Sequence, residues 1–457
     1  MNLPGILHVS TERPCIKGNI IPPPDKSITI RALVLASLAE DISRVENPLI
    51  SETTNALLES LRRIGVEIEV RQERDQTAFH IKGGLPSILH PKRPFNQLKD
   101  PLKLNLGGSA TAFRLLLGML AGINRRFVLT GDETLKHRPM DRVVEPLREM
   151  GARITYLGAQ GYPPILLEGT SLSGITYELP VPSAQVKSAI LLAGLNASGR
   201  TTVIESIATR DHTERMLPLL GVKVEISEGQ GKRVISVETL ETRKGFQVRV
   251  PGDFSSAFLP ITLSLLLKDS ELTCEGVGLN PTRLGAISVL KSAGAKISID
   301  VQEKLGNEEV GKVFSRTSDI LAFSIDETET PSMIDELPLL ALIATQAKGT
   351  SRICGLRELK VKESDRAQGT VSILKAFGAG LEIKDDGLVI EGPQRLSPAK
   401  ISVPKDHRMA MLALACAIVA GGDSEVLGFS SVKASWPEVL QSLQGCGLKG
   451  VVFSKIK

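Results

Sequence analysis

The chain of 457 residues has few cysteines, few aromatic residues and no long apolar segment. Its five cysteines form no CxxC pair and its six histidines form no HxxxH or HExxH motif, so we expect reduced thiols and no metal site. The longest apolar run, 409–420, is too short to span a membrane and predicts a buried helix. The first residues lack the charged and apolar regions of a signal peptide. These absences predict a cytoplasmic protein with no membrane partner.

The excess of positive over negative charge is also small, because the net charge is only +4. No run of Lys and Arg is interleaved with aromatic residues, so the sequence does not favour a nucleic-acid partner. Hydrophobic residues make up 42% of the chain, which is enough for a large core, and the length predicts two or more domains. With one Trp and three Tyr, that core must be built mainly from small and aliphatic residues.

One pattern recurs six times along the chain: a helix-like run ends at a glycine, and a short β-branched strand follows. The residue just past a helix usually adopts the left-handed conformation, which glycine enters without steric cost. The glycines are spaced about 70 to 86 residues apart, in the order long, short, short, long, short. This spacing suits two sets of three compact units, each with about four strands and two helices. The six glycines are Gly65, Gly151, Gly221, Gly294, Gly378 and Gly447.

Two proline-containing segments mark the points where we expect the chain to pass between domains. Pro22-Pro23-Pro24 and Val250-Pro251-Gly252-Asp253 cannot lie inside a helix, and each precedes a helix-like run. Two crossings of this kind would form a hinge beside a cleft that can close. The expected domains are 25–252 and 1–24 plus 253–457, with hinges near 22–26 and 250–253.

Basic side chains gather near the expected starts of apolar helices. A helix start exposes unpaired backbone N–H groups and the positive end of the helix dipole, so Lys or Arg there builds an anion site. The densest case is 362–366, with four charges in five residues. Each segment alone could be an ordinary helix cap or a solvated charge run, but together they favour a pocket for highly anionic small molecules. The basic segments are 26–31, 107–114, 136–139, 182–188, 362–366, 406–408 and the region of Lys433. The acidic segment 334–338 could supply an N-cap or a base for a substrate hydroxyl.

In this order, the segments resemble those of the 5-enolpyruvylshikimate-3-phosphate synthase (3-phosphoshikimate 1-carboxyvinyltransferase) family. The resemblance implies an α/β fold of two domains, an inside-out α/β barrel with three βαβαββ repeats in each domain. It implies transfer of the enolpyruvyl group of phosphoenolpyruvate to the 5-hydroxyl of shikimate 3-phosphate, with release of phosphate, by a monomer that needs no metal or other cofactor. The matching stretches are 25–31, 131–139, 181–188, 210–217, 250–253, 334–336, 361–366 and 406–408.

The resemblance also implies a role for each matching residue. Glu363 would deliver a proton to the methylene carbon, Asp335 would accept the proton of the attacking hydroxyl, and Lys26 would assist catalysis. Shikimate 3-phosphate would be bound by Lys26, Ser27, Arg31, Ser183, Ala184, Gln185, Arg210, Asp335 and Lys362. Phosphoenolpyruvate would be bound by Lys26, Ala110, Arg138, Gln185, Arg366, Arg408 and Lys433.

The chain departs from the family pattern at a few positions. Gly108 stands where Asn is usual, Ala110 where Gly is usual, and Thr53 where Asp is frequent. These departures surround the expected phosphoenolpyruvate end of the site. They leave two alternatives open: a diverged carboxyvinyltransferase with another hydroxylated acceptor, and a non-catalytic anion-binding homologue. Retention of both Asp335 and Glu363 argues against the second.

Overall fold

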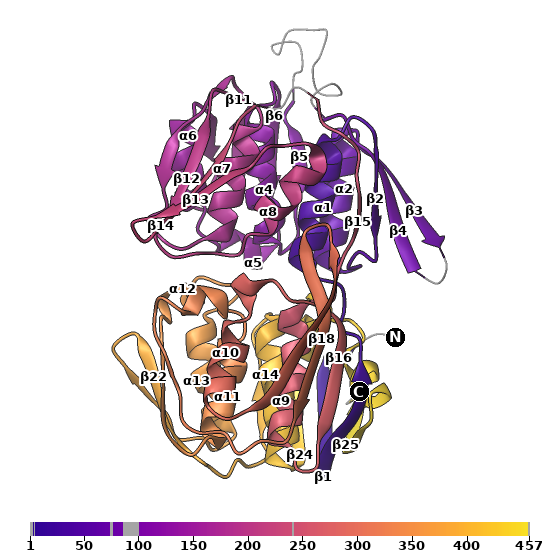
Figure 1. Ribbon diagram of the computed structural model, residues 1–457, viewed down its shortest axis with the longest axis vertical. Coiled ribbons are helices and arrows are strands. Elements are labelled where there is room, and N and C mark those ends of the chain that lie inside the picture. The colour runs from indigo at the N-terminus through magenta and orange to yellow at the C-terminus, as the bar shows by residue number, and fades with distance from the viewer. Residues whose placement is uncertain (1–2, 4, 74–75, 86–99, 240–241, 456–457) are drawn as a thin grey trace. The chain divides into compact units, whose positions relative to one another are not determined.

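The computed structural model describes residues 3, 5–73, 76–85, 100–239 and 242–455. The chain divides into two compact units (Figure 1). The N-terminal unit comprises Pro24–Val250 with the short segment Leu305–Glu308, and the C-terminal unit comprises Met1–Pro23, Pro251–Lys304 and Glu309–Lys457. Each unit mixes helices and strands, which confirms the predicted α/β class.

Among the described residues of the N-terminal unit, three four-stranded sheets share one strand pattern. In each sheet the first two strands are parallel, and the other two pairings are antiparallel. In sheet order, the strands are β15 (Gln247–Arg249), β2 (Ile42–Glu46), β4 (Gln76–Lys82) and β3 (Glu67–Glu73); β5 (Leu102–Asn105), β6 (Arg126–Thr130), β8 (Ile165–Glu168) and β7 (Arg153–Tyr156); β10 (Thr176–Glu178), β12 (Thr201–Glu205), β14 (Lys232–Val237) and β13 (Glu225–Gly229). The short strands β9 (Leu172–Ser173) and β11 (Ala197–Ser198) pair separately.

Three helices of this unit are buried over nearly their whole surface, and the sheets lie around them (Figure 1). They pack closely, since a Cβ atom on Gly118 would lie only 2.2 Å from the carbonyl oxygen of Ala189. The other helices are shorter or bury a single face. The buried helices are α1 (Lys26–Leu38), α4 (Ala110–Ala121) and α7 (Ala184–Gly194); the others are α2 (Glu52–Ile64), α5 (Glu133–Lys136), α6 (Asp141–Glu149), α8 (His212–Met216) and the 3₁₀-helix η2 (Leu217–Leu220).

The C-terminal unit contains a seven-stranded sheet and a four-stranded sheet in its described residues. The four-stranded sheet repeats the pattern of one parallel and two antiparallel pairings. The long strand β1 (Ile6–Ile20) joins the larger sheet together, because it pairs in parallel with β16 (Glu271–Gly278) and antiparallel with β24 (Gly422–Leu427) and β25 (Leu448–Lys455). The remaining strands are β17 (Lys296–Leu305), β18 (Glu308–Arg316) and β23 (Lys400–Ser402) in that sheet, and β19 (Ser324–Ile325), β20 (Gly349–Cys354), β22 (Gly387–Gly392) and β21 (Glu382–Lys384) in the smaller one.

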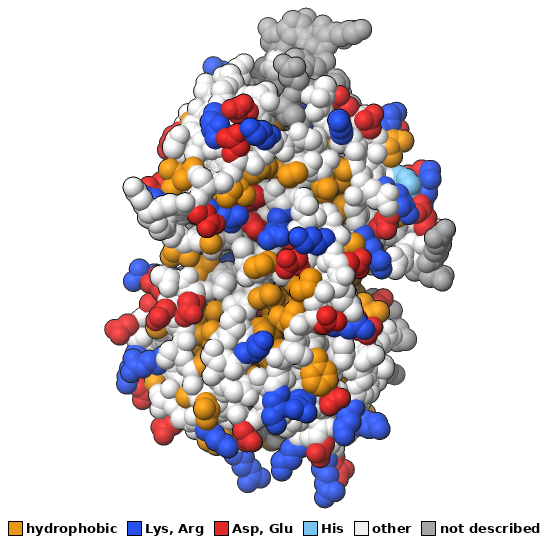
Figure 2. Space-filling model, in the orientation of Figure 1, with side chains coloured by type: hydrophobic (Ala, Val, Ile, Leu, Met, Phe, Trp, Pro, Cys, Tyr) orange, Lys and Arg blue, Asp and Glu red, His pale blue; other side chains and the backbone are white. Residues whose placement is uncertain are grey.

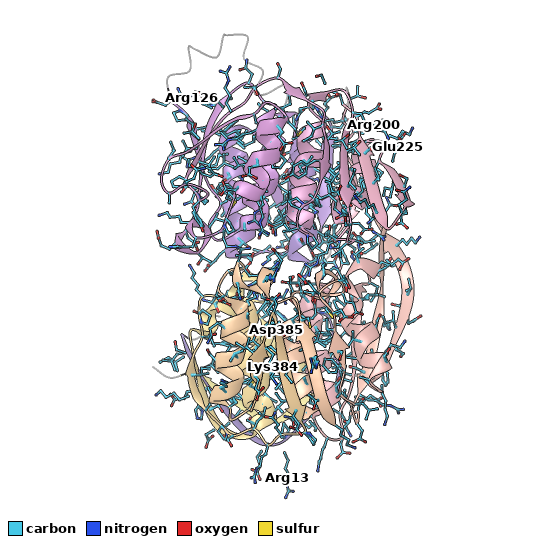
Figure 3. All side chains as sticks on the ribbon, turned by 90° about the vertical axis from the view of Figure 1, so that its left-hand side faces the viewer. Arg13, Arg126, Arg200, Glu225, Lys384 and Asp385 are labelled. Atoms are coloured by element: carbon cyan, nitrogen blue, oxygen red, sulfur yellow. The ribbon has the colours of Figure 1, made fainter. Side chains whose placement is uncertain are left out.

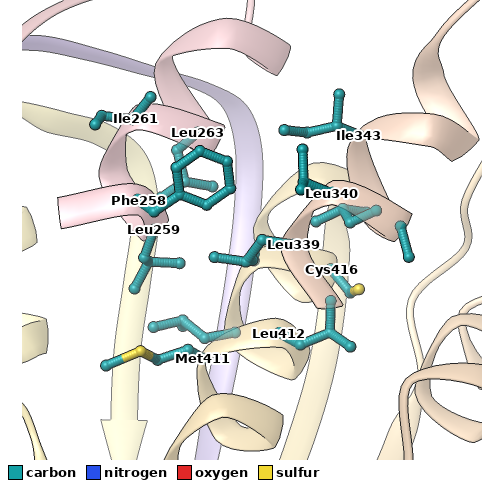
Figure 4. Packing of buried hydrophobic residues seen from close by; sticks show 14 of the residues in the cluster. Phe258, Leu259, Ile261, Leu263, Leu339, Leu340, Ile343, Met411, Leu412 and Cys416 are labelled. Carbon is teal, nitrogen blue, oxygen red and sulfur yellow. The ribbon is translucent and has the colours of Figure 1, made fainter. Parts of the chain in front are cut away.

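Three long helices form the core of the C-terminal unit, and their side chains meet in Figure 4. Phe258 of α9 (Phe254–Leu266), Leu340 of α11 (Leu337–Gln346) and Leu412 of α14 (His407–Ala420) are all fully buried there. The apolar run 409–420 thus forms a buried helix, as predicted. None of the described helices is both long and apolar enough to cross a membrane. The other helices of this unit are α10 (Gly285–Ser292), α12 (Arg357–Lys360), α13 (Arg366–Ala376), α15 (Val439–Gly445), η3 (Pro281–Arg283), η4 (Thr330–Ser332) and η5 (Phe429–Ala434).

The six glycines predicted to end helices all lie at positive φ, between 86° and 110°. A strand follows each of them, so the recurring joint between helix and strand is confirmed. At Gly221 the predicted amphipathic α-helix is wrong, because α8 ends at Met216 and the 3₁₀-helix η2 continues to Leu220. Pro218 explains this difference, since it lacks the N–H that would bond back by one α-helical turn.

Exposed charges of both signs are interspersed on the face that Figure 2 shows. Several form ion pairs: Arg200, just before β12, donates to Glu225 at the start of β13 over 2.5 Å, and Figure 3 labels both residues. Hydrogen bonds from Lys223 and Arg200 lower the pKa of Glu225 to about 2. Such exposed pairs contribute little to stability, so the fold depends mainly on its buried helices.

Candidate active site

The three buried helices of the N-terminal unit each begin at a capping side chain. Asp25 Oδ1 accepts from Ile28 N at 2.8 Å, Ser109 Oγ accepts from Ala112 N at 3.2 Å, and Ser183 Oγ accepts from Val186 N at 3.4 Å. A cap of this kind satisfies one N–H of the first turn and leaves others for a ligand. Segments far apart in the sequence therefore present the same kind of capped helix start.

Arg31 connects the starts of α1, α7 and α8. Its Nε donates to Thr213 Oγ1 at 2.8 Å, its two terminal nitrogens donate to Ser188 Oγ at 3.1 Å and to Ser27 Oγ at 2.8 Å, and only 3% of the residue is exposed. Burial lowers the pKa of Arg31 to about 10, while the carboxylate of Glu214 acts in the opposite direction. The structure thus holds a buried cation beside Ser27.

A second network connects α4 and α7. Arg114 donates to Gln185 Oε1 and to the carbonyl oxygen of Pro139, both at 2.7 Å. The Nε2 atom of Gln185 donates to Thr111 Oγ1 at 2.9 Å. Gln185 is therefore held at both ends of its amide, and the backbone next to Arg138 is held by the same guanidinium.

The turn at Gly107-Gly108 lies against the loop that leads to Arg138. Asp132 N donates to the carbonyl oxygen of Gly107 at 3.0 Å, and a Cβ atom on Gly108 would lie 3.2 Å from Asp132 Oδ2. Gly131 has less room still, because its Cβ would lie 2.3 Å from the carbonyl oxygen of Gly107. Gly131 is thus required by the close approach of two backbones, whereas the nearest neighbour of Gly108 is the end of the Asp132 side chain.

Arg366 forms the centre of a charged network in the C-terminal unit. It is 2% exposed and donates to Asp406 Oδ2 at 2.8 Å, to Asp335 Oδ1 at 2.8 Å and to Glu363 Oε2 at 2.5 Å. Burial acts to lower the pKa of Arg366, but the charges of Asp406, Glu363 and Asp335 together raise it above its usual value. The structure therefore brings the two carboxylates with predicted proton-transfer roles to one guanidinium.

Arg408 belongs to the neighbouring network around Asp253. Its backbone N–H caps α14 by donating to Asp406 Oδ1 at 2.9 Å, and its guanidinium lies 3.6 Å from Asp253 Oδ2. Arg283 donates to the other oxygen of Asp253 at 2.9 Å. Lys433 lies on η5, which contacts Asp406 because Ser431 Oγ donates to the Asp406 carbonyl oxygen at 3.3 Å.

The predicted site residues thus fall into two groups, one in each unit, and we name them for use below. The N-terminal cluster is Lys26, Ser27, Arg31, Ala110, Arg138, Ser183, Ala184, Gln185 and Arg210. The C-terminal cluster is Asp335, Lys362, Glu363, Arg366, Arg408 and Lys433. Among the residues that the structure describes, no group of three His, Cys, Asp or Glu side chains could hold a metal ion.

Sequence reasoning missed several residues that complete these networks. Asp406 stands in a motif that was singled out, but no role followed from its position beside His407 and Arg408. Thr213 and Arg283 gave no usable signal, because their partners Arg31 and Asp253 lie 182 and 30 residues away in the chain. Only the folded structure places them in contact.

Comparison with known proteins gives consistent matches along the chain. The family model described as EPSP synthase (3-phosphoshikimate 1-carboxyvinyltransferase) matches residues 11–443. A 3-phosphoshikimate 1-carboxyvinyltransferase of Alkaliphilus oremlandii is 40% identical over 429 residues, which cover 94% of this chain and 97% of the relative. The enzyme of the same name from Shouchella clausii is 39% identical over 430 residues, with 94% and 96% covered.

Solved structures match as well. An EPSP synthase from Acinetobacter baumannii has a TM-score of 0.82 and 34% sequence identity, and the match covers 98% of this chain and 100% of that chain. An enolpyruvyl transferase from Streptomyces tendae has a TM-score of 0.76 at 16% identity over the full length of both chains, which shows a shared fold.

Proposed function

The chain belongs to the EPSP synthase (3-phosphoshikimate 1-carboxyvinyltransferase) family, and from this premise we propose how its two clusters carry out the reaction. The protein is a transferase of the shikimate pathway. It moves the enolpyruvyl group of phosphoenolpyruvate to the 5-hydroxyl of shikimate 3-phosphate and releases phosphate. The resemblance drawn from the motifs is confirmed, and the observation that carries this conclusion is the family match over residues 11–443.

The N-terminal cluster binds shikimate 3-phosphate in this proposal. Arg31, Lys26 and Arg210 supply positive charge, and the starts of α1 and α7 supply N–H groups for the phosphate and hydroxyls. The four hydrogen bonds that fix Arg31 support this assignment, because they hold the guanidinium in one orientation before the ligand arrives. Ser27, Ser183, Ala184 and Gln185 complete this part of the site.

The C-terminal cluster supplies the proton chemistry. Glu363 protonates the methylene carbon of phosphoenolpyruvate, Asp335 takes the proton of the attacking 5-hydroxyl, and a new C–O bond forms at the neighbouring carbon. Loss of phosphate and of one proton then restores the double bond, so that the atoms balance. Lys362 contacts shikimate 3-phosphate, and Arg366, Arg408 and Lys433 stabilise the charge that develops on the departing phosphate.

The pairing of Arg366 suggests how binding prepares Glu363. In the structure, the guanidinium bonds to Asp335, Glu363 and Asp406, and such pairing favours charged carboxylates. The anionic groups of phosphoenolpyruvate compete for the same guanidinium N–H groups. Once the phosphoenolpyruvate anion replaces Glu363 as a partner of Arg366, Glu363 can hold the proton that it must deliver.

In this proposal, each substrate contacts residues of both units, so we propose that the two units are domains that close on the substrates. Lys26, Ala110, Arg138 and Gln185 contact phosphoenolpyruvate together with the C-terminal cluster, so the units act as two domains that close on their ligands. The domains are 25–252 and 1–24 plus 253–457, with hinges near 22–26 and 250–253. The recurring strand pattern of the sheets supports six βαβαββ repeats in an inside-out α/β barrel.

We place the enzyme in the cytoplasm as a monomer acting on small molecules, and not on nucleic acid or membranes. All five cysteines are free thiols, which supports a reducing compartment. The mixed signs of the exposed charges in Figure 2 support small-molecule substrates over a polyanion.

Phosphate release from phosphoenolpyruvate, with and without shikimate 3-phosphate, tests the proposed function. We expect release only when both substrates are present. Release with another hydroxylated acceptor, and none with shikimate 3-phosphate, would select the diverged transferase. Binding of both anions without any release would select the non-catalytic homologue.

A further inference from the structure

Arg114 is a buried cation to which the family resemblance assigned no role. It lies on α4, is 4% exposed, and joins three segments of the N-terminal unit. One terminal nitrogen donates to Gln185 Oε1 on α7, and the other donates to the carbonyl oxygen of Pro139, each at 2.7 Å. A planar guanidinium can serve two acceptors at once, whereas an ammonium is a point donor.

Helix stability alone does not account for a cation at this place. Gln185 is in the first turn of α7, and Arg114 is only five residues into α4, so its charge lies near the positive ends of helix dipoles. The two hydrogen bonds to Gln185 and Pro139 join the start of α7 to the segment beside Arg138, and this geometry suits a positioning task.

The orientation of the Gln185 amide follows directly from this contact. Its oxygen accepts from Arg114, and its nitrogen donates to Thr111 Oγ1 at 2.9 Å, so the amide cannot rotate without breaking both bonds. An amide nitrogen has two N–H donors, which leaves the second one available to a ligand. The bond to Pro139 fixes the backbone beside Arg138 in the same way.

We propose that Arg114 is a positioning residue that sets the Gln185 amide and the Arg138 backbone, and thereby the affinity for both substrates. This rests on the proposed function, in which Gln185 and Arg138 contact the ligands. Arg114 itself makes no contact with the reacting atoms in this proposal. Its effect should therefore appear mainly in KM and less in kcat.

Steady-state kinetics of Arg114→Lys test the proposal. Lysine keeps the charge but loses the two-pronged contact, so we expect KM for both substrates to rise roughly 10- to 100-fold, the size of one lost charge-assisted hydrogen bond. The matched control is Arg126→Lys on β6, a partly exposed residue labelled in Figure 3 that pairs with Glu168 at 3.5 Å. It should leave KM within twofold. Unchanged KM values in Arg114→Lys would overturn the proposal.

A double-mutant cycle separates positioning from mere structural support. If Arg114 acts through Gln185, then Arg114→Lys should change KM for shikimate 3-phosphate less than about threefold in a Gln185→Ala background. Full additivity would show that Arg114 acts by another route and would refute the proposal. Wild-type protein that releases no phosphate would instead refute the function, before any variant is compared.

Thr111→Val gives an independent test that leaves the buried cation in place, and it applies even if Arg114→Lys fails to fold. Removing the Thr111 hydroxyl frees the other end of the amide. We expect KM for shikimate 3-phosphate to rise roughly 3- to 10-fold, as for one neutral hydrogen bond. An unchanged KM would contradict the proposed fixing of Gln185.

Discussion

At the scale of single residues, the arrangement around Arg366 shows how one side chain can serve binding and proton transfer. Three carboxylates converge on a guanidinium that is almost fully buried. Asp406 is itself buried, whereas Asp335 and Glu363 remain partly exposed. The buried partner fixes Arg366 in place, and we propose that a substrate anion displaces the two partly exposed partners.

This arrangement predicts the behaviour of Glu363→Gln. Glutamine can still accept a hydrogen bond from Arg366 but cannot deliver a proton, so turnover should fall by about 10² to 10⁴-fold while substrate binding changes little. Phosphate release and isothermal titration with shikimate 3-phosphate measure the two effects. The control is Glu382→Gln on β21, an exposed residue that pairs with Lys384 at 3.1 Å. Near wild-type turnover in Glu363→Gln would move the proton donor elsewhere.

At the scale of elements, the site depends on how closely α4 and α7 approach each other. These helices carry Thr111, Arg114 and Gln185, and their contact is set by Gly118, where any Cβ would meet a backbone oxygen of α7 at 2.2 Å. Backbone cannot move aside as a flexible side chain can. The positions of the ligand-binding side chains are thus coupled to a small residue in the middle of a helix.

Gly118→Ala should therefore destabilise the protein despite the higher helix propensity of alanine. Propensity favours the change by about 1 kcal/mol, but overpacking against Ala189 costs about 1–3 kcal/mol, and KM should rise as the helices separate. Gly445→Ala is the control, because it is also in a helix and a Cβ there has no neighbour within 4 Å. It should be neutral or slightly stabilising. Urea denaturation of both variants decides the matter, and equal effects would contradict the packing argument.

Local features of these elements were predictable from the sequence, and distant contacts were not. The six helix-ending glycines follow from a conformational preference of single residues, so their positive φ values could be foreseen. Site segments were recognised from their motifs. The partners Arg114 and Gln185 lie 71 residues apart, and their contact arises only when α4 packs on α7. The α-helix predicted before Gly221 is instead a 3₁₀-helix in its last turn. This difference is local and could have been foreseen from Pro218.

At the scale of the whole molecule, the proposed function requires the two clusters to act on the same pair of substrates. Cations of the N-terminal cluster and carboxylates of the C-terminal cluster belong to separate compact units. In the proposed function, binding of both anions brings residues of the two clusters to the same substrates, and each anion alone engages only part of those residues. The chain passes between the units at 23–24 and 250–251, and again at both ends of the short segment Leu305–Glu308. We propose that the hinge lies at the first two of these points.

Small-angle X-ray scattering of Glu363→Gln tests this motion, since that variant should bind both substrates while turning them over slowly. We expect the radius of gyration to decrease when shikimate 3-phosphate and phosphoenolpyruvate are added together, and to decrease less with either one alone. Adding Arg408→Gln to the variant should reduce the response to the pair, because it removes a phosphoenolpyruvate contact in the C-terminal unit. An unchanged radius of gyration with both substrates bound would contradict closure. The phosphoenolpyruvate site would then be complete before the substrates bind.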